Sequence, residues 1–236
     1  MNIRRTIAAV ITAAACALSL TACGKDEQPI MNNNGAGNTL PGGNNKPSVN
    51  NGGAGYMQGI DDEEMALEIE RTHVRVCQST AADLYAVTKT YCAEYIAAVS
   101  SANGYSGKIY SGDTGILAEI TVVNGAATVR INGYNDAAIT DKYELGTYED
   151  YIKEQFEFTS EDNCKAVILA KKDGKPCACV YSDRADAKLG DYEYDAENDK
   201  ITVKFEWVSK DLPGVTPDGF YIGTYPYTDN KGVLTA

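Results

Sequence analysis

The stretch from Asp61 to Val99 contains neither glycine nor proline, so nothing in it breaks a helix. Acidic residues fill positions 61–64, where they suit the positive end of a helix dipole. Asn103-Gly104 supplies a stop signal shortly afterwards. The pattern predicts a helix that is roughly 58 Å long if it is continuous. In the folded chain, one side of such a long helix has to pack against a hydrophobic core.

The second half of this expected helix carries the clearer apolar stripe, which indicates that it packs on a core. The stripe has spacings of three and four and consists of Cys77, Ala81, Leu84, Thr88, Tyr91, Tyr95 and Ala98, flanked by Val87, Ile96 and Val99. The first half is polar or mixed. It therefore projects, bends near Ser79-Thr80 or forms a separate helix, and the sequence leaves these alternatives open.

After Gly104 the pattern changes to β. Strands are expected over 108–111, 116–123, 127–132, 164–171, 176–182 and 201–208. Asn124-Gly125 and Asp173-Gly174 predict hairpin turns, and a short helix is expected over 148–156. The tail, 213–236, is expected to be an ordered loop with one edge strand. A helix followed by antiparallel strands predicts an α+β fold, with the long helix packed on an antiparallel β-sheet.

The first 22 residues have the layout of a secretory signal. Arg4 and Arg5 precede an uncharged run over 7–20, which is too short to span a membrane as a helix. Leu20-Thr21-Ala22-Cys23 follows and resembles the lipobox of bacterial lipoproteins. The resemblance implies that diacylglycerol is joined to the Cys23 thiol and that the leader is cut just before it. Two or three acyl chains, such as palmitate, would anchor the protein to the extracytoplasmic face of the cell membrane.

Residues 23–59 separate this anchor from the domain expected over 60–236. The part from Pro29 to Gly59 is rich in asparagine and glycine and has one charge, Lys46, so a flexible spacer or a tolerated low-complexity insert is expected. Removing the leader changes the formal net charge from −12 to −14, because 19 basic residues then face 33 acidic ones. This charge argues against nucleic acid as a partner.

The order of elements resembles the globular half of type IV pilins and pseudopilins. Three segments carry the resemblance: 81–87 looks like the second half of the pilin helix, 173–181 like its central hairpin, and 221–226 like a closing segment of pilin-like proteins. The resemblance implies a display or assembly role without catalysis. The apolar N-terminal helix that pilins use in filaments is replaced here by the lipobox and spacer, and no cysteine follows Cys179 to form a C-terminal disulfide loop.

The expected domain contains five cysteines: Cys77, Cys92, Cys164, Cys177 and Cys179. Cys77 and Cys92 lie about 22 Å apart along one helix, and Cys177 and Cys179 point the same way along one strand. Any disulfide must therefore join helix to sheet, and buried free thiols are the favoured alternative. His73 and Cys77, one helical turn apart, could share a metal, but the Cys-x-x-Cys partner pair of a zinc site is missing.

Alternating acidic residues over 191–199 resemble a calcium loop in part. Ala196 replaces the turn glycine and Thr202 the bidentate glutamate of such a loop, so a solvated acidic loop is favoured. Known nucleophile and phosphate-binding motifs are missing, so no catalytic, cofactor or metal residue is assigned.

Sixteen tyrosines leave a glycan- or small-ligand-binding alternative open, because exposed rings stack on sugars. The tyrosines concerned are Tyr192, Tyr194, Tyr221, Tyr225 and Tyr227. The leading expectation is a non-enzymatic lipoprotein that displays a pilin-like domain for an envelope or surface protein partner.

Overall fold

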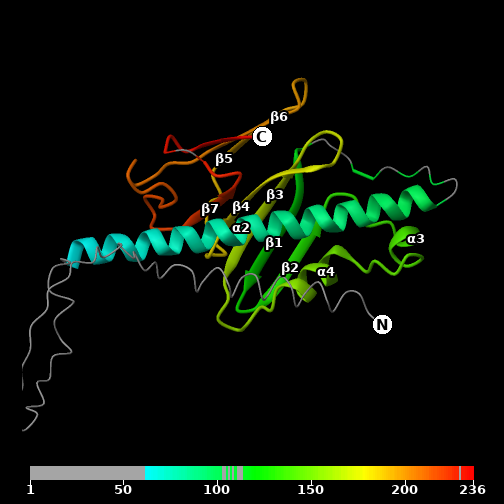
Figure 1. Cartoon of the computed structure of the whole chain (residues 1–236), viewed down its shortest axis with the longest axis horizontal. Helices are drawn as coiled ribbons and strands as arrows, with labels where there is room; N and C mark the ends of the chain where they lie inside the picture. The colour runs from blue at the N-terminus through cyan, green and yellow to red at the C-terminus, as the bar shows by residue number, and fades with distance from the viewer. Residues whose placement is uncertain (1–61, 103–104, 106, 108, 111–113, 229) are drawn as a thin grey trace, which may run out of the picture. The chain divides into compact units, whose positions relative to one another are not determined.

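A computed structural model describes residues 62–102, 105, 107, 109–110, 114–228 and 230–236. Its longest element is α2 (Asp62–Ser101), a single helix of 40 residues. The helix is continuous through Ser79-Thr80, so a separate first helix is excluded, and Figure 1 shows no sharp bend along it. In Figure 1, α2 runs across the strands of the main sheet.

The predicted stripe on α2 is confirmed, since all seven of its residues are buried, while the flanking Ile96 is 37% exposed. Two further positions, Val74 and Cys92, are buried as well. Val74 packs with Leu212 and Val215, which come from the tail of the chain. The first half of the helix is therefore held by tail residues at Val74, and it exposes apolar side chains such as Ile69 on its other side.

The main sheet has five antiparallel strands in the order β2-β1-β3-β4-β7. The strands are β1 (Ile116–Val123), β2 (Ala126–Ile131), β3 (Cys164–Ala170), β4 (Pro176–Ser182) and β7 (Ile222–Tyr225). Asn124 and Gly125 both have positive φ, as the tight β1–β2 turn requires, and Gly174 has positive φ in the β3–β4 turn. The α+β fold, with α2 packed on antiparallel strands, is thus confirmed.

A second sheet has three antiparallel strands in the order β5-β6-β8. They are β5 (Asp191–Asp195), β6 (Lys200–Lys204) and β8 (Val233–Thr235). Ile201 and Val203 from β6 pack with Leu169, Val180 and other side chains on the face of the main sheet opposite α2. The molecule from Ile60 to Ala236 therefore has three layers: α2, the main sheet and the small sheet.

Two short helices, α3 (Ala137–Thr140) and α4 (Tyr148–Gln155), complete the core on the α2 side. Thr147 caps α4 as predicted, because its hydroxyl accepts a hydrogen bond from the Asp150 backbone N–H at 3.1 Å. Ile139, Tyr148 and Ile152 bring these helices into the larger core cluster.

Several boundaries differ from the prediction. The described residues of the expected strand 108–111, Ile109 and Tyr110, are not in a strand. The expected strand over 201–208 ends at Lys204, and the tail contains two short strands, β7 and β8, where one was expected.

Candidate functional site

A cleft of about 400 Å³ opens where α2 meets the chain between α4 and β3. Its floor is apolar and contains the buried side chains of Leu84, Ile120 and Ala166, which come from α2, β1 and β3. Its wall includes Tyr181 near the end of β4 and Asp183 just beyond it. Three different elements of the core therefore hold the floor in place.

The segment after α4 forms the second wall. At the end of α4, Phe156 has the extended dihedral angles φ −123° and ψ 117°, so the chain leaves the helix as an extended strand-like segment. Phe156 and Phe158 stack with ring centroids 6.3 Å apart. Because side chains two residues apart share a side of an extended chain, both rings line the cleft.

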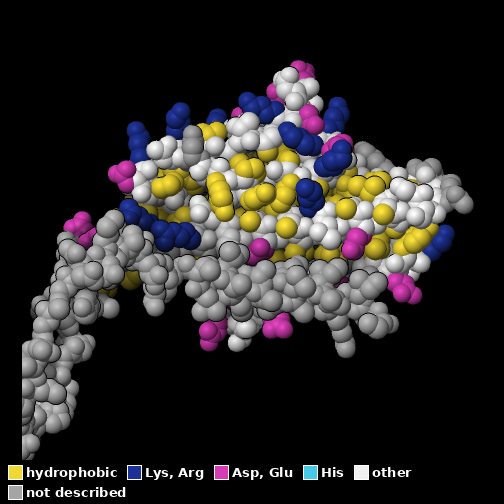
Figure 2. Space-filling view, in the orientation of Figure 1, with side chains coloured by type: hydrophobic (Ala, Val, Ile, Leu, Met, Phe, Trp, Pro, Cys, Tyr) yellow, Lys and Arg dark blue, Asp and Glu magenta, His cyan; other side chains and the backbone are white. Residues whose placement is uncertain are grey.

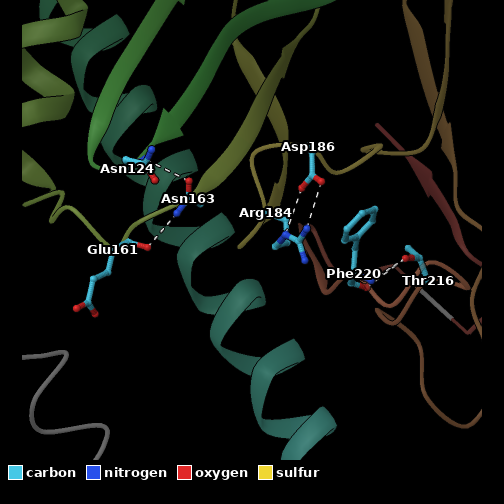
Figure 3. Close-up of polar contacts among 7 residues, drawn as sticks. All are labelled: Asn124, Glu161, Asn163, Arg184, Asp186, Thr216 and Phe220. Atoms are coloured by element: carbon cyan, nitrogen blue, oxygen red, sulfur yellow. Dashed lines mark hydrogen bonds and ion pairs between the residues drawn. The ribbon is translucent and has the colours of Figure 1, made fainter.

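The turn before β3 is fixed by side-chain amides and carboxylates. The Asp162 carboxylate accepts hydrogen bonds from the backbone N–H and the hydroxyl of Thr159. The Asn163 side-chain oxygen accepts from the Asn124 backbone N–H at 3.1 Å, and its amide group donates to the Glu161 carbonyl oxygen at 3.1 Å (Figure 3). These bonds tie the cleft wall to the β1–β2 turn.

Asp183 has an unusual environment. Among the described residues, no other residue donates a hydrogen bond to its Oδ1 atom, which is shielded from solvent. Burial raises the pKa of the Asp183 carboxyl, while His73, the residue's own backbone N–H and Arg184 lower it to a smaller extent. Burial thus disfavours the charged form of this carboxyl.

The neighbouring Arg184 is engaged with Asp186 and Phe220. Its Nε and one terminal nitrogen each lie 3.2 Å from a carboxylate oxygen of Asp186, and its guanidinium carbon lies 5.1 Å from the Phe220 ring centroid (Figure 3). Phe220 is positioned by Thr216, whose hydroxyl accepts from the Phe220 backbone N–H at 3.0 Å. Arg184 therefore neutralises Asp186 in preference to Asp183.

A shallower hollow of about 650 Å³ adjoins the cleft on the side of Asp186 and Val123. The two hollows share Glu161, Asn163 and Asp183 as lining residues. The two hollows therefore adjoin, and Arg184 lines the shallower one in addition to Asp186.

The cleft is acidic. Four carboxyl-bearing residues line it, and its lining contains no lysine, arginine or histidine; the acidic residues are Glu157, Glu161, Asp162 and Asp183. Figure 2 shows, on the face drawn, Lys and Arg side chains gathered mainly above the band of hydrophobic side chains. Asp and Glu side chains stand among them.

The thiols near the cleft are not poised to react. Cys77, Cys92, Cys164, Cys177 and Cys179 are all free in the described structure. Burial, with a smaller contribution from the nearby Asp183, raises the pKa of Cys77 to about 12 and that of Cys164 to about 11. Both thiols are therefore protonated and weakly nucleophilic at neutral pH.

The expectation that Cys177 and Cys179 point the same way is wrong. Ala170 of β3 pairs with Pro176, and Leu169 pairs with Ala178, so Cys177 is the extra residue of a β-bulge. The bulge interrupts the alternation of β4. Cys179 belongs to the cluster under α2, and Cys177 packs against the cluster on the opposite face.

His73 and Cys77 have separate environments. The His73 ring stacks on the Tyr221 ring, with centroids 4.7 Å apart and an angle of 16° between the planes, whereas the Cys77 side chain is buried. Among the described residues, no group of three His, Cys, Asp or Glu side chains is close enough to hold a metal ion.

The acidic segment 191–199 is not a loop, contrary to the favoured interpretation. Residues 191–195 form β5, and the chain then turns into β6. The Asp195 carboxylate closes this turn by accepting from the backbone N–H groups of Glu197 and Asn198 at 3.0 and 3.1 Å. A strand and a tight turn cannot wrap around an ion as a calcium loop does.

The tyrosines singled out for a glycan site have mixed roles. Tyr221 packs on His73, and Tyr225 packs on Tyr85 of α2 with ring centroids 4.7 Å apart. Both rings thus join the tail to α2. Tyr227 is 64% exposed and Tyr192 is 36% exposed, so these are the rings with most surface for a ligand.

Cys23, the leader and the spacer lie outside the described residues. In the part of the chain that is described, no helix is long and apolar enough to cross a membrane. No family model, no curated protein and no solved structure matches this chain.

Sequence reasoning missed Asp183, Phe156 and Phe158 as site residues. One signal was present, because Asp183 directly follows the apolar strand that was expected to end at Ser182. The approach of the 156–163 segment to that strand end depends on tertiary packing, which no local pattern encodes.

Proposed function

We propose that this chain is a lipid-anchored, extracytoplasmic protein without catalytic activity, whose domain from Ile60 to Ala236 binds an envelope or surface protein. The observation that carries the binding role is the cleft beside α2, with its apolar floor, aromatic walls and half-buried Asp183. Concave sites with a mostly apolar lining and a few polar groups are typical of binding sites.

The anchor is supported by the sequence Leu20-Thr21-Ala22-Cys23 at the end of an apolar run. The spacer that follows would hold the domain about 30 Å from the membrane surface. A lipid on Cys23 therefore gives the domain reach and rotational freedom, which suits a protein that displays a binding surface.

The absence of catalysis is supported by the chemistry beside the cleft. The thiols of Cys77 and Cys164 have raised pKa values, and the His73 ring stacks on Tyr221. A nucleophile needs an activating base within hydrogen-bonding distance. Protonated thiols without an activating base favour binding over covalent chemistry.

A pilin-like display role is part of the proposal. It is supported by the long helix α2 packed on an antiparallel sheet and by the central β3–β4 hairpin. Pilins enter their filaments through an apolar N-terminal helix, and the lipobox and spacer stand in its place here. The domain would therefore be displayed on the spacer.

Partition between detergent and aqueous phases tests the anchor. We expect the protein from native cells to enter the detergent phase and to incorporate labelled palmitate. Cys23→Ser should abolish both, because the thiol that carries the lipid is removed. Cys16→Ser, which changes a cysteine of the leader, is the matched control and should leave both unchanged. A Cys23→Ser protein that still partitions and labels like the wild type would refute the anchor.

A surface receptor for a glycan is the second candidate, favoured by the exposed Tyr227 ring next to Tyr225. Saturable sugar binding that is lost on Tyr227→Ala would favour it. Sugar binding unchanged by that substitution, or no sugar binding, would count against this surface as a glycan site.

A further inference from the structure

We propose that the cleft beside α2 receives a lysine or arginine side chain of the protein partner. This inference rests on the proposed function and names the chemistry that the partner presents. It depends on four features of the cleft: its charge, its aromatic walls, the Asp183 carboxyl and the adjoining hollow.

The charge of the lining selects for a cation. Four carboxyl-bearing residues and no basic residue line the cleft. Glu157 and Glu161 are exposed, and Asp162 is engaged with Thr159. A cationic group in the cleft would therefore meet several negative charges at close range without displacing a cation of the protein.

The aromatic walls suit a cation that is attached to an apolar stem. Phe156, Phe158 and Tyr181 are half-buried, so each presents part of its ring to the cleft. Methylene groups of a lysine or arginine pack on such rings, and the charged end gains a cation–π attraction of about 0.5–2 kcal/mol. A metal ion or a small hydrated cation would leave these rings unused.

Asp183 supplies the directional contact. Asp183 is half-buried and lines both the cleft and the adjoining hollow, and the adjacent Arg184 is engaged with Asp186 and Phe220. Partial burial makes an unpaired carboxylate unfavourable. A guanidinium or ammonium group in the cleft would pair with this carboxylate through a charge-assisted hydrogen bond.

The shape favours a protein segment over a free amine. The cleft of about 400 Å³ is within the usual size range of ligand sites and exceeds the volume of one side chain. It continues into the hollow beside Asp186 through the shared residues Glu161, Asn163 and Asp183. A segment that places its basic residue in the cleft can therefore lay a neighbouring residue in the adjoining hollow.

Calorimetric titration of the purified full chain in nonionic detergent tests the proposal. The probes are the peptides acetyl-Leu-Lys-Leu-amide and acetyl-Leu-Arg-Leu-amide. The neutral control peptide has norleucine in place of lysine, and spermidine is the free-amine control. A salt concentration of 0.15 M screens the overall negative charge of the protein, since the Debye length is then about 8 Å.

We expect one saturable site per chain for the lysine or arginine peptide. The affinity should fall about ten-fold or more with the norleucine peptide, which corresponds to the loss of about 1.4 kcal/mol. Asp183→Asn should lower the affinity for the basic peptide by a similar factor, and Glu161→Gln should lower it by less. Glu94→Gln removes the same charge from an exposed position of α2 outside the cleft lining and should change nothing.

Three results would overturn the proposal. The first is equal affinity for the basic and the norleucine peptides. The second is an equal loss of affinity for the basic peptide in Asp183→Asn and Glu94→Gln, which would indicate unspecific charge attraction. The third is tighter binding of spermidine than of either basic peptide, which would assign the cleft to free amines. None of these results affects lipidation of Cys23 or a crosslink from the cleft to a protein partner, so the proposed function fails or holds separately.

Discussion

The hydroxyl oxygens of Thr88 and Tyr148 lie 2.6 Å apart in the core between α2 and α4. The Thr88 hydroxyl donates its single proton to the Leu84 carbonyl oxygen at 2.7 Å. Tyr148 must therefore be the donor to Thr88, and the three groups form a chain of hydrogen bonds. Tyr148 is buried, so α4 is attached to α2 by both apolar contact and this bond.

Tyr148→Phe should lower the free energy of unfolding by about 1–2 kcal/mol, because it removes a buried hydrogen bond and leaves the ring in place. Thermal unfolding should then occur about 2–4 °C lower for each kcal/mol in a domain of this size. Tyr227→Phe is the control, since Tyr227 is 64% exposed, and it should change stability by less than about 0.5 kcal/mol. Equal effects of the two substitutions would contradict a role for the buried bond.

Gly223 of β7 allows close approach of the sheet to α2. A Cβ at this position would overlap the backbone carbonyl group of Cys77, and neither backbone can move without disturbing its helix or strand. Gly223→Ala should therefore lower stability by about 3 kcal/mol.

Gly219→Ala is a useful comparison for that substitution. Gly219 has φ +76° with nothing within 4 Å of an added Cβ, so only backbone strain of about 1–2 kcal/mol is expected. Chemical denaturation of both variants measures the difference. A smaller loss for Gly223→Ala than for Gly219→Ala would show that the contact with α2 is looser than described.

Asp183→Asn should stabilise the protein at neutral pH by about 0.5–1 kcal/mol, as is common when a functional charge is removed. Because burial raises the pKa of Asp183 in the folded state, folding favours the protonated form. The loss of stability that ionised Asp183 causes in the wild type therefore grows as pH rises through the folded-state pKa. This loss vanishes below the ordinary pKa of 3.8.

Urea unfolding from pH 3.5 to 7.5 measures this difference between wild type and Asp183→Asn. His73 of α2 and Arg184 lower the pKa of Asp183 and so favour its charged form, and the thiol of Cys77 lies near it as well. His73→Gln should enlarge the advantage of Asp183→Asn. A stability difference that is constant over this pH range would contradict the burial of the carboxyl.

Thiol counting tests the cysteine assignment. The native protein should react slowly with a thiol reagent, because burial raises the pKa of Cys92 to about 12 and that of Cys177 to about 11. After unfolding without reductant, five thiols should react if the chain begins at a lipidated Cys23. A count of one would indicate two disulfides, and a count of six would indicate that Cys23 carries no lipid.

The fold could be predicted to a large extent from local patterns. The buried face of α2, from Cys77 to Ala98, follows helical spacing, and the Asn124-Gly125 turn follows from the positive φ that these residues tolerate. The small sheet was harder to predict. Asp191–Asp195 forms a strand even though its carboxylates suggest a loop, because it pairs with β6, whose Ile201 and Val203 are buried on the main sheet.

The candidate site could not be predicted in the same way. Asp183, Phe158 and Thr80 are far apart in sequence, and they meet only because β4 and the 156–163 segment both pack against α2. The bulge at Cys177 has the same origin, since its position depends on the pairing between β3 and β4. Residue spacing within one segment carries no information about such contacts.

Site-specific photo-crosslinking in intact native cells tests the proposed function most directly. A photoreactive amino acid would replace Phe158 in the cleft wall or, as a control, the exposed Val208 outside the cleft lining. We predict a crosslink from position 158 to an envelope or surface protein, at a peptide that contains lysine or arginine, and its loss on Asp183→Asn. Crosslinks only to glycan, no protein product, or the same products from position 208 would contradict the account.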